Sequence, residues 1–224
     1  MTQPKTVVKI SIVSDFICPW CRIGEKRLEN AIAQLPDNIE VELRWLPYEL
    51  NPQMPKEGMN RDIYRAIKFG SWQKSQMLDA GTIEAGAPDG VKFDYDKIRF
   101  TPNTFSAHKL TYWADLQGKQ SDVAHRILKA YFLDGRDIGD TTVLAKIAEE
   151  AGLDAEKAKQ FLADVETDAI VEELLNQIVI AGVAGVPQFD IEGTIVRGAQ
   201  SAETLADAIL TAAKDKKTSE LKIA

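Results

Sequence analysis

The sequence contains few cysteines and histidines and has no long apolar run. Only two cysteines and two histidines occur among its 224 residues, which excludes a framework of several disulfide bonds. No stretch approaches the roughly 20 apolar residues of a membrane-spanning helix. The polar amino terminus also shows no secretory signal. These absences predict a cytoplasmic protein that does not insert into a membrane.

Acidic residues outnumber basic ones. There are 34 Asp and Glu against 27 Lys and Arg, giving a formal net charge of −7 at pH 7. Nucleic acids and anionic lipids are themselves negatively charged, so we expect neither a nucleic-acid nor a membrane partner. The composition is 45% hydrophobic and 27% charged, as in globular proteins, and the length suits one domain with a large insertion. Either a monomer or a homodimer fits this length.

Both cysteines lie in one tetrapeptide, Cys18-Pro19-Trp20-Cys21. A disulfide that closes so short a loop stabilises a fold by only about 2 kcal/mol, so a structural staple is a poor explanation. A zinc ion needs about four ligands, and the remaining soft candidates, His108 and His125, fit no zinc-binding spacing. A redox-active pair explains the spacing better than a staple, a metal site or coincidence, and we expect no metal.

The cysteine pair follows a predicted strand and begins a predicted helix. Residues 7–13 form a β-rich apolar run, and residues 19–35 carry an apolar stripe with helical spacing. Cys18 therefore falls at a helix N-terminus, where free backbone N–H groups and the helix dipole favour a thiolate. The thiolate is the attacking species in disulfide exchange. Cys21 is then placed to attack the sulfur of Cys18 and resolve a mixed disulfide.

The rest of the chain divides into a helical middle and a final return to strands. A period-two strand covers residues 39–45, and prolines after it mark a boundary near Leu50. The pattern predicts helices over residues 60–69, 71–85, 103 or 104 to 117, 121–133 and 140–151, with two more from Asp154 and Asp168. Ser121 and Asp168 are predicted caps for two of them. A hairpin over residues 188–197 and a helix opened by Ser201 complete the order.

In this order the chain resembles the DsbA family of thioredoxin-fold oxidoreductases. The likeness rests on the Cys18–Cys21 tetrapeptide after a strand, the helical insertion, and Gly185-Val186-Pro187 before the terminal hairpin. It implies an α/β, thioredoxin-like fold with a large all-helical insertion. The thioredoxin-like domain would be discontinuous, comprising residues 1–50 and 168–224, and the inserted helical domain would comprise residues 51–167.

Longer motifs are similar to the cytoplasmic FrnE-like branch of that family. These motifs are Ser14-Asp15-Phe16-Ile17 before the tetrapeptide, Pro102-Asn103-Thr104, Ala107-His108, and Gly185 to Phe189 followed by Gly198-Ala199-Gln200. They lie in both outer parts and in the middle of the chain.

The resemblance implies that the Val186–Pro187 peptide bond is cis and faces the cysteines. In such folds the backbone before the proline pairs with an extended substrate segment, so Val186 and Pro187 are candidate substrate-binding residues. The alternative is a trans proline that starts an edge strand. Trp20, between the cysteines, is expected at the surface beside the site and is a third candidate for substrate binding.

The sequence departs from the pattern of thioredoxin-like proteins at one position. Many of them carry a buried carboxylate six residues before the nucleophilic cysteine. Here that position is Ile12. Asp15 is nearer to Cys18 and is a candidate modulator of the cysteine pKa values, although a loop Asp is more often a solvated cap. His108 is a second candidate, although a lone helical His is usually a hydrogen-bonded structural residue. His125 has no supporting context.

Four large apolar residues of the helical part fit either an adaptable substrate surface or core packing: Met54, Met59, Trp72 and Met77.

Together these features predict a thiol–disulfide oxidoreductase that acts through Cys18 and Cys21 on protein or small-molecule disulfides or thiols. No bound cofactor is expected, and glutathione is a candidate redox partner. A glutathione-dependent isomerase or transferase, of the kappa or 2-hydroxychromene-2-carboxylate isomerase type, is one alternative. Those proteins typically place Ser at the position of Cys18 and lack a resolving thiol. A polypeptide-binding holdase with an apolar groove is the other alternative.

Overall fold

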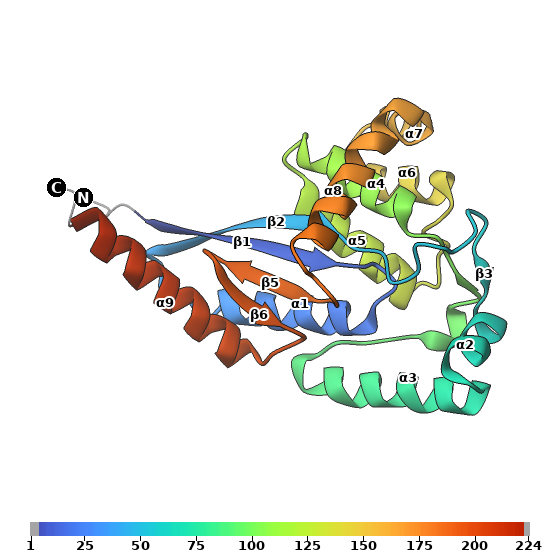
Figure 1. The fold of residues 1–224 in the computed structure, drawn as a ribbon, viewed down its shortest axis with the longest axis horizontal. Helices are drawn as coiled ribbons and strands as arrows, with labels where there is room; N and C mark the ends of the chain where they lie inside the picture. The colour runs from blue at the N-terminus through green and yellow to red at the C-terminus, as the bar shows by residue number, and fades with distance from the viewer. Residues whose placement is uncertain (1–4, 222–224) are drawn as a thin grey trace.

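The structure, a computed structural model, describes residues 5–221 and is built around a four-stranded sheet (Figure 1). The strands are β1 (Thr6–Ser14), β2 (Ile39–Pro47), β5 (Gln188–Ile191) and β6 (Thr194–Arg197). Their order across the sheet is β2-β1-β5-β6. β1 runs parallel to β2 and antiparallel to β5, which in turn is antiparallel to β6. This is the mixed α/β arrangement that the sequence predicts.

Strand β1 lies in the middle of the sheet and carries its most buried residues. Val8, Ile10 and Ile12 are at most 2% exposed, because they alternate along the strand and point to one face. Ile12 pairs with Trp45 of β2 on one side and with Phe189 of β5 on the other. The position that often holds a carboxylate in thioredoxin-like proteins is therefore part of the apolar core.

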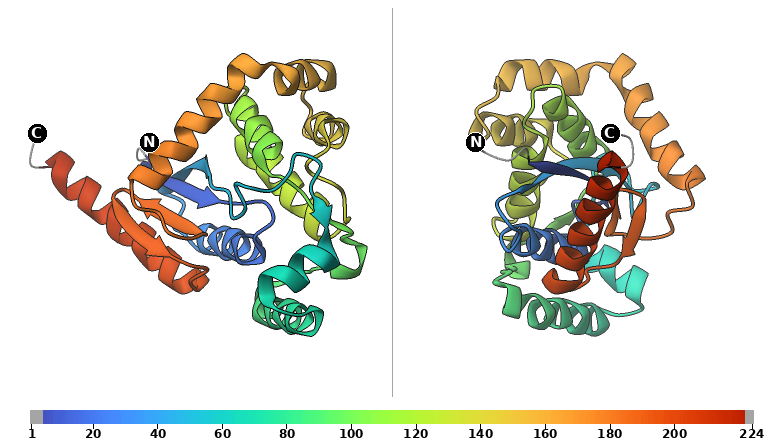
Figure 2. Two further views of the ribbon diagram at one scale, coloured as in Figure 1. Left: turned by 45° about the vertical axis from the view of Figure 1, so that its right-hand side comes forward. Right: turned by 90° about the vertical axis from the view of Figure 1, so that its left-hand side faces the viewer.

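Helices cover both faces of the sheet. On one face, α1 (Pro19–Ile32) and α9 (Ala202–Leu221) pack against each other, and α9 also contacts β1. On the other face, α8 (Asp168–Ile180) crosses the sheet and contacts β2, as the two views of Figure 2 show. The N-terminus of α1 lies at the end of β1, beside the loop that precedes β5.

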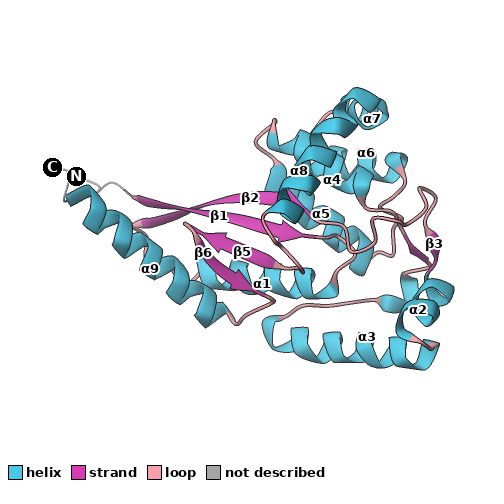
Figure 3. Cartoon of the chain, viewed as in Figure 1, coloured by secondary structure: helices cyan, strands magenta, loops and turns pink. Residues whose placement is uncertain are grey.

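The segment between β2 and α8 is mostly helical (Figure 3). Its helices are α2 (Arg61–Phe69), α3 (Trp72–Gly86), α4 (Phe105–Asp115), α5 (Gln120–Phe132), α6 (Thr141–Glu150) and α7 (Ala155–Ala163). It also has three single-turn 3-10 helices (Ala87–Asp89, Tyr95–Lys97 and Val165–Thr167) and a short antiparallel pair, β3 (Met59–Asn60) with β4 (Phe100–Thr101).

One apolar core runs from the sheet into the helical segment. Buried residues of β1, such as Ile10, belong to the same cluster as Leu110 of α4 and Ile127 of α5. The division of the chain into a discontinuous thioredoxin-like domain and an inserted domain stays a prediction. Among the described residues, no helix combines the length and apolar character that crossing a membrane requires.

Arg27 of α1 joins three separate segments. Its Nε donates to Asp89 Oδ2 at 2.7 Å, beyond the end of α3. Its Nη2 and Nη1 donate to the carbonyl oxygens of Ala85, at 2.9 Å, and of Ala199, at 2.6 Å. These bonds fix α1 relative to both the helical segment and the loop that leads into α9.

Some helices start where the sequence predicts, but two of the predicted capping residues do not cap their helices. The helices predicted to start at Asp140 and Asp154 are α6 and α7, and both aspartates cap them with their side chains. Ser121 does not cap α5, because the helix begins at Gln120 and the Ser121 hydroxyl accepts a hydrogen bond from Trp45 Nε1. Asp168 does not cap α8 either, because its carboxylate accepts from the buried Lys109 ammonium. In both cases a partner distant in sequence takes the side chain that a local cap would use.

Candidate functional site

Cys18 occupies the N-terminal cap position of α1, and Pro19 is the first helical residue. The Cys18 carbonyl accepts from the N–H groups of Cys21, at 3.0 Å, and Arg22, at 3.2 Å, which starts the helix. The first turn contains no acidic residue. The sulfur of Cys18 therefore lies at the positive end of the helix dipole, where an anion is stabilised.

The loop before β5 faces Cys18. The Sγ of Cys18 donates to the carbonyl oxygen of Val186 at 3.8 Å, and the Val186–Pro187 peptide bond is cis. Gly24 of α1 permits this approach: a Cβ at Gly24 would lie 2.9 Å from Pro187 Cγ and 3.1 Å from Phe189 Cζ. The structure thus brings together Cys18, Val186 and Pro187.

Cys21 is more deeply enclosed than its partner. Both thiols are free, and their side chains are 4% and 2% exposed for Cys18 and Cys21. Burial raises the pKa of Cys21 well above its usual range, and the hydrogen bond with Cys18 raises it further. The Ser14 hydroxyl and the Asp15 backbone act in the opposite direction. Cys21 therefore holds its proton at neutral pH in the dithiol form.

Asp15 links the cysteine loop to His108. Its carbonyl accepts from the N–H of Cys18 at 3.1 Å, and its side chain is completely buried. Oδ2 accepts from the N–H of Leu50 at 2.7 Å, and Oδ1 lies 3.7 Å from Nε2 of His108. Asp15 is therefore not the solvated loop residue that aspartates in loops usually are.

His108 is held by hydrogen bonding and packing. Its Nε2 lies 2.9 Å from the carbonyl oxygen of Tyr48, and its ring contacts that of Phe16 with centroids 4.9 Å apart. The residue is 5% exposed. His108 is thus a hydrogen-bonded buried histidine that also faces Asp15.

Glu49 belongs to the same buried group and was missed by sequence reasoning. Burial raises its pKa, the charge of His108 opposes the rise, and the charge of Asp15 adds to it. Its Oε1 is buried without a hydrogen-bond partner. No local signal marks Glu49 in the sequence, because its charged neighbours come from the loop after β1 (Asp15) and from α4 (His108).

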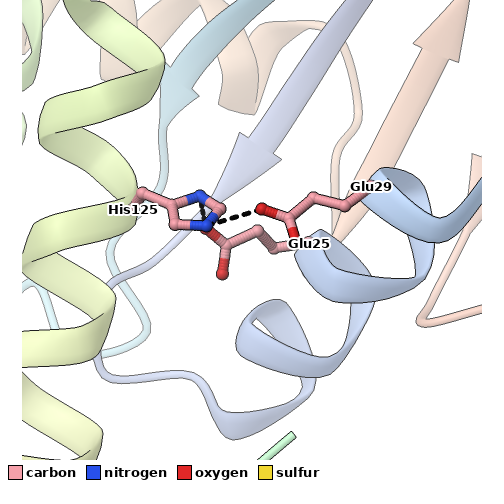
Figure 4. Close-up of side chains that lie close together, drawn as sticks. All are labelled: Glu25, Glu29 and His125. Atoms are coloured by element: carbon pink, nitrogen blue, oxygen red, sulfur yellow. Dashed lines mark ion pairs between the residues drawn. The ribbon is translucent and has the colours of Figure 1, made fainter. Parts of the chain in front are cut away.

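His125, for which the sequence offers no context, lies between two carboxylates (Figure 4). Its Nδ1 is 2.5 Å from Oε1 of Glu25, and its Nε2 is 2.5 Å from Oε1 of Glu29. These contacts raise the pKa of His125 to about 10. Partial burial acts to raise the pKa of Glu29, but the contacts with His125 and Lys26 outweigh it and lower that pKa to about 2.

The same three side chains form the one candidate metal group within residues 5–221: their ligand atoms lie within 4.8 Å of one another. Each ring nitrogen of His125 faces a different carboxylate, whereas a metal ion would bind one nitrogen and draw both carboxylates toward it. Glu25 is also paired with Arg22 at 2.6 Å. The contacts are those of a charged network that joins α1 to α5.

A cavity of about 480 Å³ opens beside Cys18, between the start of α1 and the helices α2 and α3. Its apolar lining includes Trp20, Leu50, Phe69, Met77 and Leu78. Trp20 is 44% exposed, so it lies at the surface beside Cys18. Of the four large apolar residues singled out in the sequence, Met77 lines this cavity, while Met54 is buried.

The sequence matches a known family along most of its length. The DSBA-like thioredoxin domain matches residues 9–210. The chain is also 29% identical over 210 residues to YwbO, an uncharacterized protein of Bacillus subtilis, and the match covers 93% of this chain and 99% of that one.

Solved structures share the fold. A probable DsbA oxidoreductase from Streptomyces coelicolor is 29% identical, with a TM-score of 0.82 over 92% of this chain and 89% of that chain. A 2-hydroxychromene-2-carboxylate isomerase is 14% identical, with a TM-score of 0.71 over 95% and 98% of the two chains. The cytosolic disulfide reductase DsbM from Pseudomonas aeruginosa, solved with GSH, is 17% identical, with a TM-score of 0.62 over 94% and 98%. The isomerase and DsbM are so distant in sequence that their likeness shows the fold alone. The predicted thioredoxin-like fold with helical content is confirmed.

Proposed function

Because this chain belongs to the DSBA-like thioredoxin domain family, we propose that it is a thiol–disulfide oxidoreductase that works through Cys18 and Cys21. One observation carries the proposal. The sulfur of Cys18 lies at the positive end of the α1 dipole and is hydrogen-bonded to the carbonyl oxygen of Val186. The Cys21 thiol lies beside it and is hydrogen-bonded to it. This arrangement supplies an attacking sulfur, a resolving sulfur and a backbone edge for the substrate.

In the reducing direction, the thiolate of Cys18 attacks one sulfur of a substrate disulfide. A Cys18–substrate S–S bond forms, the substrate S–S bond breaks, and the second substrate sulfur leaves as a thiolate. Cys21 then gives up its proton, attacks the Cys18 sulfur, and releases the first substrate sulfur. The enzyme ends with a Cys18–Cys21 disulfide, and two electrons have passed to the substrate. Oxidation of a substrate dithiol is the same sequence in reverse.

The elevated pKa of Cys21 determines that Cys18 attacks the substrate first and that Cys21 attacks the mixed disulfide second. Cys21 stays protonated while Cys18 makes the first attack, because burial disfavours its thiolate. In the mixed disulfide the Cys18 sulfur no longer hydrogen-bonds as a thiol, which removes one of the causes of the elevated pKa. Val186 and Pro187 would hold the substrate backbone as an added strand, and Asp15 and His108 would tune the charge beneath the cysteine pair.

The test compares the wild type with two variants. Cys18→Ser is expected to abolish insulin reduction and the refolding of a scrambled disulfide substrate. Cys21→Ala is expected to accumulate stable mixed disulfides with substrate, detectable as adducts by mass spectrometry. Wild-type activity in Cys18→Ser would refute the proposal.

Two alternatives remain distinguishable from this function. The structural likeness to a 2-hydroxychromene-2-carboxylate isomerase is the reason to test a glutathione-dependent isomerase as an alternative function. Such an enzyme would isomerise a small substrate in the presence of glutathione and would not need Cys21. A polypeptide-binding holdase would keep its binding in a Cys18→Ser, Cys21→Ser double variant, whereas an oxidoreductase loses its activity there.

The finer assignments are part of the same proposal. We place the protein in the FrnE-like branch, in the cytoplasm, with thiol- or disulfide-containing substrates and with glutathione as the redox partner. The structure of DsbM with GSH supports testing glutathione first. Equilibrating Cys18 and Cys21 with glutathione buffers of varied ratio measures their reduction potential and shows which direction of exchange is favoured.

A further inference from the structure

The cavity beside Cys18 is lined by more basic than acidic side chains, although the whole chain has a formal net charge of −7. Two basic residues of α2, Arg65 and Lys68, line it. Asp79 of α3 is its one acidic lining residue in the described part of the chain. The balance of charge on the lining of this cavity is therefore opposite to that of the protein as a whole.

Two guanidinium groups share the carboxylate of Asp79. Arg61 Nη2 lies 2.6 Å from Oδ2, and Arg65 Nη2 lies 2.7 Å from Oδ1. Arg61 is only 3% exposed, so water screens its charge weakly. Because one carboxylate cannot neutralise two guanidinium groups, an excess positive charge remains here: Arg65 lines the cavity, and Arg61 lies outside the lining, on the other side of Asp79.

Lys68 adds a second unbalanced charge at the mouth of the cavity. Its Nζ donates to Asn51 Oδ1 at 2.6 Å and to the Tyr64 hydroxyl at 2.8 Å. Both partners are neutral, and among the side chains described, those of residues 5–218, no ion pair of Lys68 with a carboxylate is found. An ammonium group has three donors, so one N–H remains for an incoming acceptor.

We propose that this cavity selects low-molecular-weight disulfides that carry a carboxylate near the sulfur, with Lys68 as the residue that binds the carboxylate. The proposal rests on the proposed function, since it names the substrate class of the same site. A volume of about 480 Å³ falls in the range of pockets for small ligands. The apolar lining would hold the carbon chain, Cys18 would meet the sulfur, and the excess positive charge would meet the carboxylate. Oxidised glutathione is a larger disulfide whose carboxylates lie farther from the sulfur, at the two ends of each half.

The experiment uses three disulfides with similar short carbon chains and different charge. 3,3′-Dithiodipropionate is doubly negative, bis(2-hydroxyethyl) disulfide is uncharged, and cystamine is doubly positive. The pre-reduced full-length protein is mixed with each, and oxidation of Cys18 and Cys21 is followed by quenching and mass spectrometry. Each rate constant is compared between wild type, Lys68→Gln, Lys68→Glu and the control Lys74→Gln, an exposed lysine of α3 outside the cavity lining.

Lys68→Gln is expected to slow the reaction with dithiodipropionate by about three- to fivefold, as loss of one exposed ion pair does. It should speed the reaction with cystamine, because a like charge is removed. Lys68→Glu should shift the ratio of the two rates further in the same direction. Raising the salt concentration should shrink these differences, and Lys74→Gln should keep the wild-type ratio.

The outcomes separate this inference from the proposed function. Equal changes with all three disulfides would show that Lys68 acts on the cysteines rather than on the substrate, and the inference would be overturned. An unchanged ratio in both Lys68 variants would overturn it as well, while leaving the oxidoreductase function intact. If the wild-type protein reacted with none of the three disulfides faster than a free dithiol, both the proposed function and the inference would fall.

Discussion

The sulfur of Cys18 lies 3.8 Å from the carbonyl oxygen of Val186, although 168 positions separate the two residues in the chain. Sheet topology explains this proximity. β1 and β5 are antiparallel neighbours, and Val13 near the end of β1 pairs with Gln188 at the start of β5. The loop that follows β1 and the loop that precedes β5 therefore meet at the same end of these two central strands. The nucleophile and the substrate-binding backbone of the proposed site come from these two loops.

The first prediction concerns the order in which the two thiols react. In the reduced native protein at pH about 7, iodoacetamide should modify Cys18 well before Cys21. Only a thiolate reacts, and burial raises the pKa of Cys21. Cys18 also borders the open cavity, whereas Cys21 does not line it. Peptide mass spectrometry over time gives the two rates. Modification of Cys21 should accelerate as the pH is raised toward about 9, and equal rates at neutral pH would contradict the assignment of roles.

The second prediction concerns the packing of α1 against Pro187. Gly24→Ala should lower the free energy of unfolding by about 1 to 3 kcal/mol, because the added methyl group overlaps the proline ring at 2.9 Å. Insulin reduction should also slow, since α1 carries Cys18. Gly81→Ala in α3 is the control: no atom lies within 4 Å of its added Cβ, and alanine stabilises a helix by up to about 1 kcal/mol relative to glycine. Urea unfolding of both variants measures the contrast, and a stabilised Gly24→Ala would show that the contact relaxes freely.

The third prediction concerns the partly buried carboxyl of Glu49. Its pKa is raised from 4.5 in the folded protein by burial, so folding favours the protonated form. Ionisation of Glu49 therefore removes stability as the pH rises from about 4.5 through the raised folded value. Glu49→Gln should match the wild type below pH 4.5 and be more stable above it, by about 0.5 to 1 kcal/mol because the group is partly solvated.

The measurement for Glu49 is urea unfolding between about pH 4 and pH 8. Glu57→Gln is the control, because Glu57 is exposed and surface substitutions of this kind change stability by about 0.5 kcal/mol or less. Destabilisation by Glu49→Gln at neutral pH would indicate that the carboxylate is needed in its charged form.

The fourth prediction concerns the charged network between α1 and α5. His125→Asn should lower the free energy of unfolding by about 1 kcal/mol, a modest value because the His125 side chain is 41% exposed and water screens it. The pKa of His125 rises from 6.5 to about 10 on folding, so its contribution is complete below pH 6.5 and is lost toward pH 10. The pKa of Glu29 falls from 4.5 to about 2, so its contribution is complete above pH 4.5 and is lost toward pH 2.

The advantage of the wild type over His125→Asn should therefore be largest between about pH 4.5 and 6.5 and shrink on both sides. Arg126→Gln removes the exposed pair with Asp122 on the same helix and should cost only a few tenths of a kcal/mol. Adding zinc should not raise the melting temperature of the wild type, since the contacts are those of ion pairs. A zinc-dependent rise that His125→Asn abolishes would instead identify a metal site.

Much of the fold could be predicted from local sequence patterns. The alternation along residues 39–45 and the apolar stripes of the helices are properties of single segments, and the structure forms the corresponding elements. Cys18 could be placed at a helix N-terminus for the same reason, because Pro19 and the apolar stripe that follows it are local signals. The α/β, thioredoxin-like class was implied by the family resemblance, which rests on motifs placed in this order of elements.

What could not be predicted depends on segments that meet only in the folded chain. Ser121 and Asp168 have the composition of caps, but Trp45 and Lys109 take their side chains. His125 looked isolated because Glu25 and Glu29 reach it from α1. Glu49 carries no pattern of its own, and its charged neighbours come from the loop after β1 and from α4. Each of these features depends on which elements pack together, and a single sequence does not encode that locally.

Arg27 bears on how such a protein can be re-engineered. Its guanidinium binds Asp89 and Ala85 in the helical segment and Ala199 before α9, so one side chain ties the C-terminal end of α3 to α1 and to the loop before α9. A chimera that exchanged residues between β2 and α8 for those of a relative would have to preserve an acceptor at the position of Asp89. Without it α3, which lines the cavity beside Cys18, would lose one of its ties to α1, and we expect such a chimera to keep its chemistry while its substrate range changes.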